Sequence, residues 1–185
     1  MRDNVTNTEK YVNMADIISG RDPGEADIVA LIELLFFAYR DFVSDPDEIL
    51  KEFGFGRAHH RALHFVGRDP GMTVAQLLDI LRITKQSLAR VLKELIDKGF
   101  VFQKEGEADR RQRLLHLTDS GEELRQRLMA PQVARIKRAL TQAGSSDGTS
   151  YRSVLYHLVS PENRESVRDW IENTSIIGGD GQDRD

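Results

Sequence analysis

Residues 73–118 decide the fold and read TVAQLLDILRITKQSLARVLKELIDKGFVFQKEGEADRRQRLLHLT. Thr73 and Gln76 match the capping pattern in which a hydroxyl and a side-chain amide satisfy the unpaired donors at a helix start. A three-residue turn then leads to Thr84, an N-cap for a second helix. That helix ends near Gly99, where a left-handed C-cap belongs. The first part of the stretch therefore predicts two helices joined by a short turn, a helix-turn-helix.

The second part of the stretch predicts a small hairpin. Residues 100–104 and 113–117 have the length and apolar content of short strands, and the segment between them contains Gly106. We therefore expect a mainly α protein with a small antiparallel β-wing.

The helix that begins at Thr84 has two contrasting sides. One side is an apolar stripe at helical spacing, made of Leu88, Val91, Leu92, Leu95 and Ile96. The other side and the first turn carry Lys85, Gln86, Ser87, Arg90 and Lys93. Burial of the stripe against a core turns the polar side outward, and these residue types contact base edges and phosphates in DNA. We interpret this helix as one that reads DNA.

Composition sets outer limits on the function. The 185-residue chain has a formal net charge of −4 and contains no cysteine. Disulfides, thiolate metal sites and cysteine redox sensing are therefore excluded within it. Lys and Arg outnumber Asp and Glu between Arg82 and Arg113, whereas acids predominate elsewhere; a basic patch on an acidic body is typical of a site-specific DNA binder. We see no signal peptide and no membrane-spanning run, and we expect a cytoplasmic protein without a cofactor.

The rest of the chain is expected to support assembly. Residues 27–43 predict a helix that is apolar on two sides, and in so short a chain the second cover points to another subunit. Ser160 and Pro161 are predicted to start the last helix as its N-cap and first residue. We divide the chain into a flexible arm (1–24), an N-terminal dimerisation helix region (25–53), a DNA-binding domain (54–118), C-terminal dimerisation helices (119–174) and a disordered tail (175–185).

The order of these features is specific. A helix-turn-helix and Gly99 are followed by a strand, a tip with Asp109-Arg110-Arg111, a second strand and then Leu117-Thr118-x-x-Gly121. In this order the sequence resembles the MarR family of winged helix-turn-helix repressors. The family's Asp-x-Arg wing motif falls on Asp109 and Arg111, and its Leu-Thr on Leu117-Thr118.

The resemblance implies more than the spacing does. Family members are homodimers whose first and last helices interlock, with flanking dimerisation helices on each side of the winged head. It implies that the helix from Thr84 enters the major groove of double-stranded DNA and that Arg111 probes the minor groove. It also implies that Asp109 braces the wing by pairing with an arginine. Many members release DNA when a small anionic or aromatic effector binds between the dimerisation helices and the head.

We therefore assign two sets of candidate DNA contacts. The recognition-helix set is Thr84, Lys85, Gln86, Ser87, Arg90 and Lys93, and the wing set is Lys104, Asp109, Arg110, Arg111 and Arg113. One departure from the family lies at Arg82, where members often have Gly in the turn. A left-handed Arg82 would cost roughly 1–2 kcal/mol, and its side chain could instead contact phosphate.

Other interpretations remain open at this stage. Phe36, Tyr39, His60 and His64 are candidate lining residues of an effector pocket, although aromatics at helical spacing are more often plain core. His60 and His64 stand one helical turn apart, but spacing alone is weak evidence for a metal, and we assign none. No nucleophile, phosphate-loop or paired-carboxylate motif supports an enzyme. The alternative function is a winged helix that binds proteins without sequence-specific DNA binding.

Overall fold

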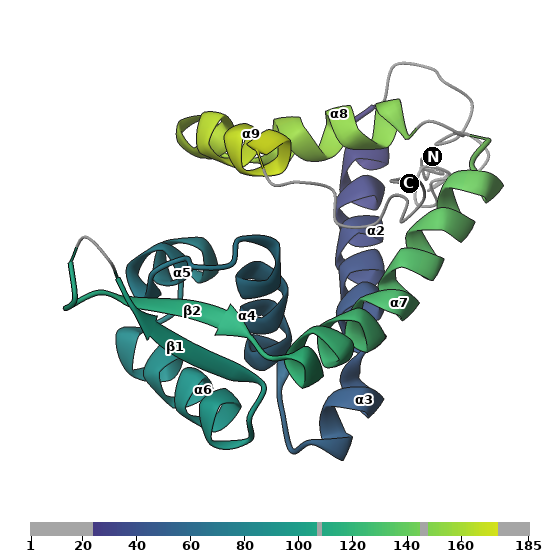
Figure 1. The fold of residues 1–185 in the computed structure, drawn as a ribbon. Helices are drawn as coiled ribbons and strands as arrows, with labels where there is room; N and C mark the ends of the chain where they lie inside the picture. Colours follow the sequence, from purple (N-terminus) through teal and green to yellow (C-terminus); the bar gives the residue numbers. More distant parts are fainter. Residues whose placement is uncertain (1–23, 107–108, 145–147, 174–185) are drawn as a thin grey trace, which may run out of the picture. The chain divides into compact units, whose positions relative to one another are not determined.

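The computed structural model describes residues 24–106, 109–144 and 148–173 (Figure 1). Contacts divide the chain into two compact units, 1–44 and 45–185, and each is described by itself. The described helices and strands of the second unit are α3 (Asp47–Glu52), α4 (Arg57–Arg68), α5 (Val74–Leu81), α6 (Lys85–Asp97), β1 (Val101–Glu105), β2 (Arg113–Leu117), α7 (Asp119–Gln142), α8 (Thr149–Leu158), η1 (Pro161–Asn163) and α9 (Arg164–Asn173). The expected mainly α fold with one antiparallel hairpin is confirmed. None of the described helices is long and apolar enough to cross a membrane.

In the first unit, the described residues form the single helix α2 (Glu25–Ser44), close to the predicted 27–43. The Asp27 carboxylate accepts a hydrogen bond from the Gly24 backbone N–H at 3.0 Å, which satisfies a donor at the helix start. The large apolar side chains of α2 are exposed on several sides of the helix rather than along one stripe. They are Ile28, Val29, Leu31, Ile32, Leu34, Leu35, Phe36, Phe37 and Tyr39. Exposed apolar surface of this extent on one helix is typical of surfaces that bind another protein chain.

The core of the second unit lies where α4, α5 and α6 meet the hairpin. Leu63 of α4, Leu77 of α5, Leu95 of α6 and Leu115 of β2 are each fully buried. The strands pair antiparallel from Val101 opposite Leu117 to Glu105 opposite Arg113. A single bridge from Thr73 to Leu114 adds the start of α5 to the same sheet edge. The hairpin is thereby fixed on the helix-turn-helix.

The C-terminal helices follow the predicted order with one correction. Ser160 and Pro161 were expected to cap and begin the last helix, but residues 161–163 form the 3-10 turn η1 and α9 begins at Arg164. Ser160 makes no side-chain capping bond. The physical reason is local competition: the Asn163 N–H bonds the Ser160 carbonyl at 2.9 Å, so the turn closes in i+3 rather than i+4 spacing.

Candidate nucleic-acid interface

The turn between α5 and α6 is built by local capping. Thr73 and Gln76 form the predicted capping box at the start of α5. Arg82 then adopts a left-handed conformation, with φ 51° and ψ 45°, so the departure noted in the sequence is a real left-handed site. The Thr84 hydroxyl accepts the Ser87 N–H at 3.1 Å and starts α6, as predicted. These caps set the direction in which α6 leaves the turn.

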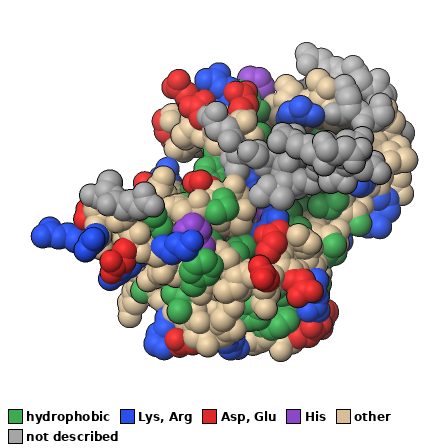
Figure 2. Space-filling view, viewed as in Figure 1, with side chains coloured by type: hydrophobic (Ala, Val, Ile, Leu, Met, Phe, Trp, Pro, Cys, Tyr) green, Lys and Arg blue, Asp and Glu red, His purple; other side chains and the backbone are tan. Residues whose placement is uncertain are grey.

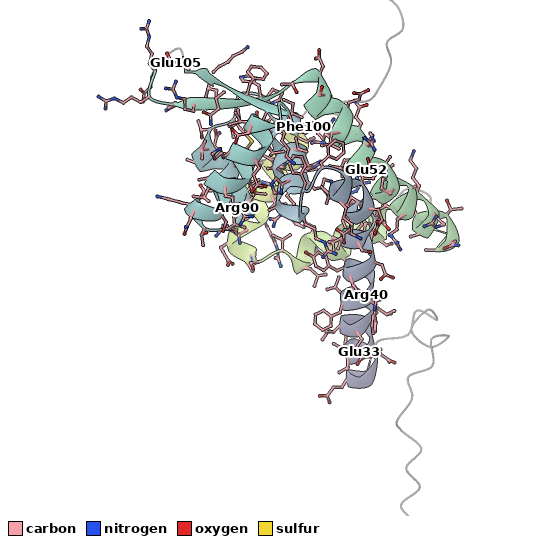
Figure 3. All side chains as sticks on the ribbon, turned by 90° about the horizontal axis from the view of Figure 1, so that it is seen from below. Glu33, Arg40, Glu52, Arg90, Phe100 and Glu105 are labelled. Carbon is pink, nitrogen blue, oxygen red and sulfur yellow. The ribbon has the colours of Figure 1, made fainter. Side chains whose placement is uncertain are left out.

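The faces of α6 are as the stripe predicted. Leu88, Val91, Leu92 and Leu95 are buried, and Ile96 is half-buried against the core. All of the polar candidates on this helix are exposed: Lys85, Gln86, Ser87, Arg90 and Lys93, with Thr84 exposed at the cap. In Figure 3, Arg90 on α6 and Glu105 near the tip of the wing lie toward the same side of the head. The surface beside the wing is therefore polar and accessible.

Two of the cations on α6 already have carboxylate partners on the same helix. Arg90 Nε lies 2.9 Å from Glu94 Oε1, and Lys93 pairs with Asp97. The other carboxylate oxygen of Glu94, Oε2, lies 2.9 Å from His59 Nε2. The hydrogen bond from Arg90, helped by His59, holds the pKa of Glu94 below its usual range. A DNA phosphate or base would have to compete with these carboxylates for Arg90 and Lys93.

Cations also project from the wing, as Figure 2 shows at the left edge of the view. Arg110 and Arg111 are exposed, and within the described residues neither guanidinium has a hydrogen bond or ion pair. Arg113 is paired with Glu105 at 2.8 Å across the strands, and Lys104 lies over the Phe102 ring at 5.5 Å. Arg110 and Arg111 are thus the wing cations most ready to meet a phosphate or a minor groove.

Asp109 braces the wing through the backbone. Its Oδ1 accepts the Arg111 backbone N–H at 2.9 Å, whereas the resemblance implied a pairing with an arginine side chain. Two backbone bonds, Gly106 N–H to the Gln112 carbonyl and Gln112 N–H to the Asp109 carbonyl, close the same turn. The carboxylate therefore shapes the loop that carries Arg111 instead of neutralising its charge.

The Leu-Thr-x-x-Gly segment joins the base of the wing to the end of α6. The Thr118 hydroxyl accepts the Gly121 N–H at 3.0 Å and donates to the Gly99 carbonyl at 2.7 Å. Gly99 is left-handed at φ +77°, as its C-cap position predicted. The Thr118 N–H also bonds the Phe100 carbonyl. One threonine thus ties together the end of α6, the wing and the start of α7.

The four candidate effector residues belong to separate units. Phe36 and Tyr39 on α2 are 67% and 64% exposed, while His60 on α4 is buried and His64 half-buried. Burial lowers the pKa of His60, and burial with the nearby Arg125 charge lowers that of His64 to about 4. His60 Nε2 and His64 Nδ1 are buried without a hydrogen-bond partner within the described residues. No group of metal-ligating side chains forms in the described part of the chain.

Sequence reasoning missed the buried arginine whose charge acts on His64. Arg125 of α7 is buried and makes a bidentate ion pair with Glu122, at 2.7 and 2.6 Å. It also contacts Gly67 of α4 closely, since a Cβ there would lie 2.4 Å from Arg125 Cδ. A signal was available, because Arg125 adjoins Leu124 and Leu128 on the buried stripe of α7, where a lone arginine is unusual.

Comparison with known proteins agrees with this geometry. The sequence model of the MarR family matches residues 53–112. The HTH-type transcriptional regulator PetP of Rhodobacter capsulatus is 47% identical over 133 residues, which are 72% of this chain and 80% of that protein. A crystal structure of a MarR family transcription regulator superimposes with a TM-score of 0.62 at 19% identity, covering 78% of this chain and 93% of the other. A MarR family protein of Mycobacterium tuberculosis, in complex with p-aminosalicylic acid, gives 0.52 at 23% identity, covering 70% and 98%.

Proposed function

The chain belongs to the MarR family of transcriptional regulators, and from that premise we propose that it is a repressor that binds a pseudo-palindromic operator as a homodimer. The relatives are regulators rather than enzymes, in keeping with the lack of a catalytic motif. The observation that carries the proposal is the exposed polar face of α6 on the same head as an arginine-bearing wing. α6 can contact base edges while the wing contacts the DNA backbone and the minor groove.

The proposed homodimer rests on the apolar surfaces outside the head. α2 carries exposed apolar side chains, and α8 carries a second set: Tyr151, Val154, Leu155 and Leu158. A groove of about 770 Å³ runs along α8 and α9 with a mostly apolar lining. We assign the exposed apolar faces of α2 and α8 to the dimer interface. Two-fold symmetry would then place the two α6 helices about one DNA turn apart, roughly 10 bp centre to centre. Such a protein acts on the chromosome, in the cytoplasm.

We assign the roles of the DNA contacts by their chemistry. Gln86 and Arg90 are the specificity candidates, because each can bond a base edge in the major groove at about 1–3 kcal/mol of discrimination. Arg111 is the affinity candidate, because a narrow minor groove concentrates negative potential. Lys85, Ser87, Lys93, Lys104, Arg110 and Arg113 supply phosphate contacts, and Thr84 and Asp109 hold the backbone that presents them.

The test is an affinity series on DNA upstream of the chain's own gene, measured by fluorescence anisotropy across a salt range. Arg111→Ala should weaken binding to operator and unrelated DNA alike and reduce the salt slope by about one unit. Gln86→Ala should weaken operator binding with little effect on unrelated DNA. Lys51→Ala, which removes an exposed cation from α3, is the matched control. Absent or salt-insensitive binding by the parent protein would refute DNA recognition and favour a protein-interaction module.

We propose further that a small aromatic acid relieves repression by binding near His60 and His64. His60 Nε2 and His64 Nδ1 have no hydrogen-bond partner within the described residues, and a carboxylic acid could bond both. p-Aminosalicylic acid, bound in one structural relative, is the first probe. Ligand at 100 times its Kd should raise the stability by about 2.7 kcal/mol, visible as a thermal shift. His64→Leu should abolish the shift and Lys51→Ala should not; an unaltered shift in His64→Leu would place the site elsewhere.

A further inference from the structure

Arg82 occupies a backbone conformation that ordinarily selects glycine. Within the described residues it is the one non-glycine residue with a positive φ. A left-handed L-residue is strained by roughly 1–2 kcal/mol because its Cβ approaches the following carbonyl, and hydrogen bonds from the side chain can offset that cost. The Arg82 side chain has two acceptors, one in the head and one in the C-terminal segment.

The first acceptor lies on α5. Arg82 Nε donates to the Asp79 carbonyl at 3.0 Å, while its backbone N–H bonds the Leu78 carbonyl. Arg61 of α4 donates to the Leu81 carbonyl at 2.9 Å. The last carbonyls of α5, which carry its negative dipole end, are therefore occupied by two arginines. These bonds hold the turn from the α4 and α5 side.

The second acceptor lies 81 positions further along the chain. Arg82 Nη2 donates to Asn163 Oδ1 at 3.2 Å, which joins the α5–α6 turn to η1. Asn163 stands at a corner that is fixed by its own bonds. Arg164 donates to the Val159 and His157 carbonyls at 2.9 and 2.8 Å, and so closes the end of α8. The acceptor is therefore presented by a folded corner rather than by a loose loop.

A second contact docks the same C-terminal segment on the head. Trp170 of α9 meets Phe65 of α4 edge-on, with ring centroids 5.6 Å apart, and packs against the core. In Figure 1, α9 lies along the α4 and α5 side of the head. The η1 corner and α9 thus contact the head at two points: Phe65 of α4, and Arg82, two residues before the Thr84 cap of α6.

We propose that Arg82 is a positioning residue that sets the start of α6 against the α8–α9 corner through Asn163. The C-terminal helices then fix where Gln86 and its neighbours stand, and a shift of that corner is transmitted to the recognition helix. This inference rests on the proposed reading of DNA by α6. Its rival is that the Arg82 guanidinium contacts a DNA phosphate directly.

The test uses full-length Arg82→Gly, Asn163→Ala, the double variant and Asn163→Asp. Arg82→Gly relieves the backbone strain and removes the side-chain bonds to the Asp79 carbonyl and to Asn163. Asn163→Ala removes only the bond between Arg82 and Asn163. Asn163→Asp keeps an acceptor for Arg82 and adds a charge. Operator and unrelated DNA are titrated over a salt series. Quenching of Trp170, the single tryptophan of the chain, reports the docking of α9 without any DNA.

A positioning role predicts that Arg82→Gly and Asn163→Ala each lower operator affinity by roughly fivefold, the scale of one net hydrogen bond. The double variant should be no weaker than the weaker single one, because both remove the same link. Affinity for unrelated DNA and the salt slope should stay at the parent values, and Asn163→Asp should bind the operator within about twofold of the parent. Trp170 should become easier to quench in both single variants.

Other outcomes overturn the proposal. A salt slope lowered by about one unit in Arg82→Gly, with Asn163→Ala unchanged and Asn163→Asp weakened, would identify a phosphate contact. Parent affinity and parent quenching in both single variants would show that the link does not position α6. If the parent protein binds no DNA, the proposed function fails, whereas the quenching result still shows whether Arg82 and Asn163 hold the corner in place.

Discussion

Gly121 is the position at which one methyl group should do most harm. It lies in the first turn of α7 with an ordinary helical backbone, where alanine normally stabilises by about 0.5–1 kcal/mol relative to glycine. A Cβ at Gly121, however, would lie 2.0 Å from the Phe100 carbonyl oxygen and 3.3 Å from Leu117 Cβ. Carbon–oxygen contacts are usually no shorter than about 3.3 Å, so the backbones must separate by more than 1 Å.

The cost follows from what that separation breaks. Overpacking of a close contact costs about 1–3 kcal/mol. The Phe100 carbonyl also accepts the Thr118 N–H at 3.1 Å, and loss of this bond adds about 1 kcal/mol. We expect Gly121→Ala to lower the free energy of unfolding by about 2–4 kcal/mol, a large part of the 5–15 kcal/mol typical of a folded protein. The sign is opposite to the helix-propensity expectation.

Urea denaturation followed by Trp170 fluorescence measures this change. All variants must be compared at one protein concentration, because the unfolding midpoint of the proposed homodimer depends on it. Ser120→Ala is the matched control, since Ser120 is the exposed neighbour in the same helical turn and should stay within about 0.5 kcal/mol of the parent. A midpoint for Gly121→Ala at or above that of the parent would show that the close approach to Phe100 does not constrain this turn.

Three further predictions follow from single contacts. Thr118→Val should lose about 2 kcal/mol of stability, because the cap on Gly121 and the bond to Gly99 both disappear, and Thr118→Ser should retain most of it in the same urea assay. Burial lowers the pKa of His64 from about 6.5 in the unfolded chain to about 4 in the folded protein, so the stability that neutral His64 contributes is complete above pH 6.5. About 3 kcal/mol of the free energy of unfolding should be lost as the pH falls to 4. His64→Leu should flatten that pH dependence in urea titrations at several pH values, and an unchanged dependence would contradict the burial argument. Glu94→Gln should free Arg90 and raise operator affinity several-fold by anisotropy, whereas a loss of affinity would mean that the ion pair orients Arg90 for DNA.

The parts of the fold that the sequence predicted well depend on neighbours within a few residues. The stripe of α6 and its Thr84 cap repeat every turn or bond the next turn, so periodicity and capping patterns were sufficient. The hairpin was predictable for the same reason, and strand β1 differs from the expected 100–104 by a single position at each end. The left-handed site at Arg82 was indicated only by the resemblance, because family members often have glycine at this position of the turn.

The features that the sequence did not predict depend on contacts with residues far away in the chain. The Arg82 to Asn163 bond and the effect of the Arg125 charge on His64 join segments far apart in sequence, and periodicity describes only the faces of one helix. The α9 boundary failed differently, because Ser160 had the right residue type for a cap but its carbonyl closed a tighter turn. Residue type shows what a side chain can bond, and the competing acceptors around it decide what it does bond.

The same competition explains how an acidic chain can be a DNA reader. Two of the three cations on the outer side of α6 are held by carboxylates of their own helix, so we expect α6 to attract DNA of any sequence only weakly. In the proposed function, Arg90 leaves Glu94 where a base edge or phosphate replaces the lost pairing, and this makes its contact depend on the DNA sequence. On the wing, Arg110 and Arg111 keep their charge available, and Asp109 bonds the backbone rather than their guanidinium groups. We infer that the wing supplies most of the general attraction, while the partly neutralised α6 makes binding depend on sequence.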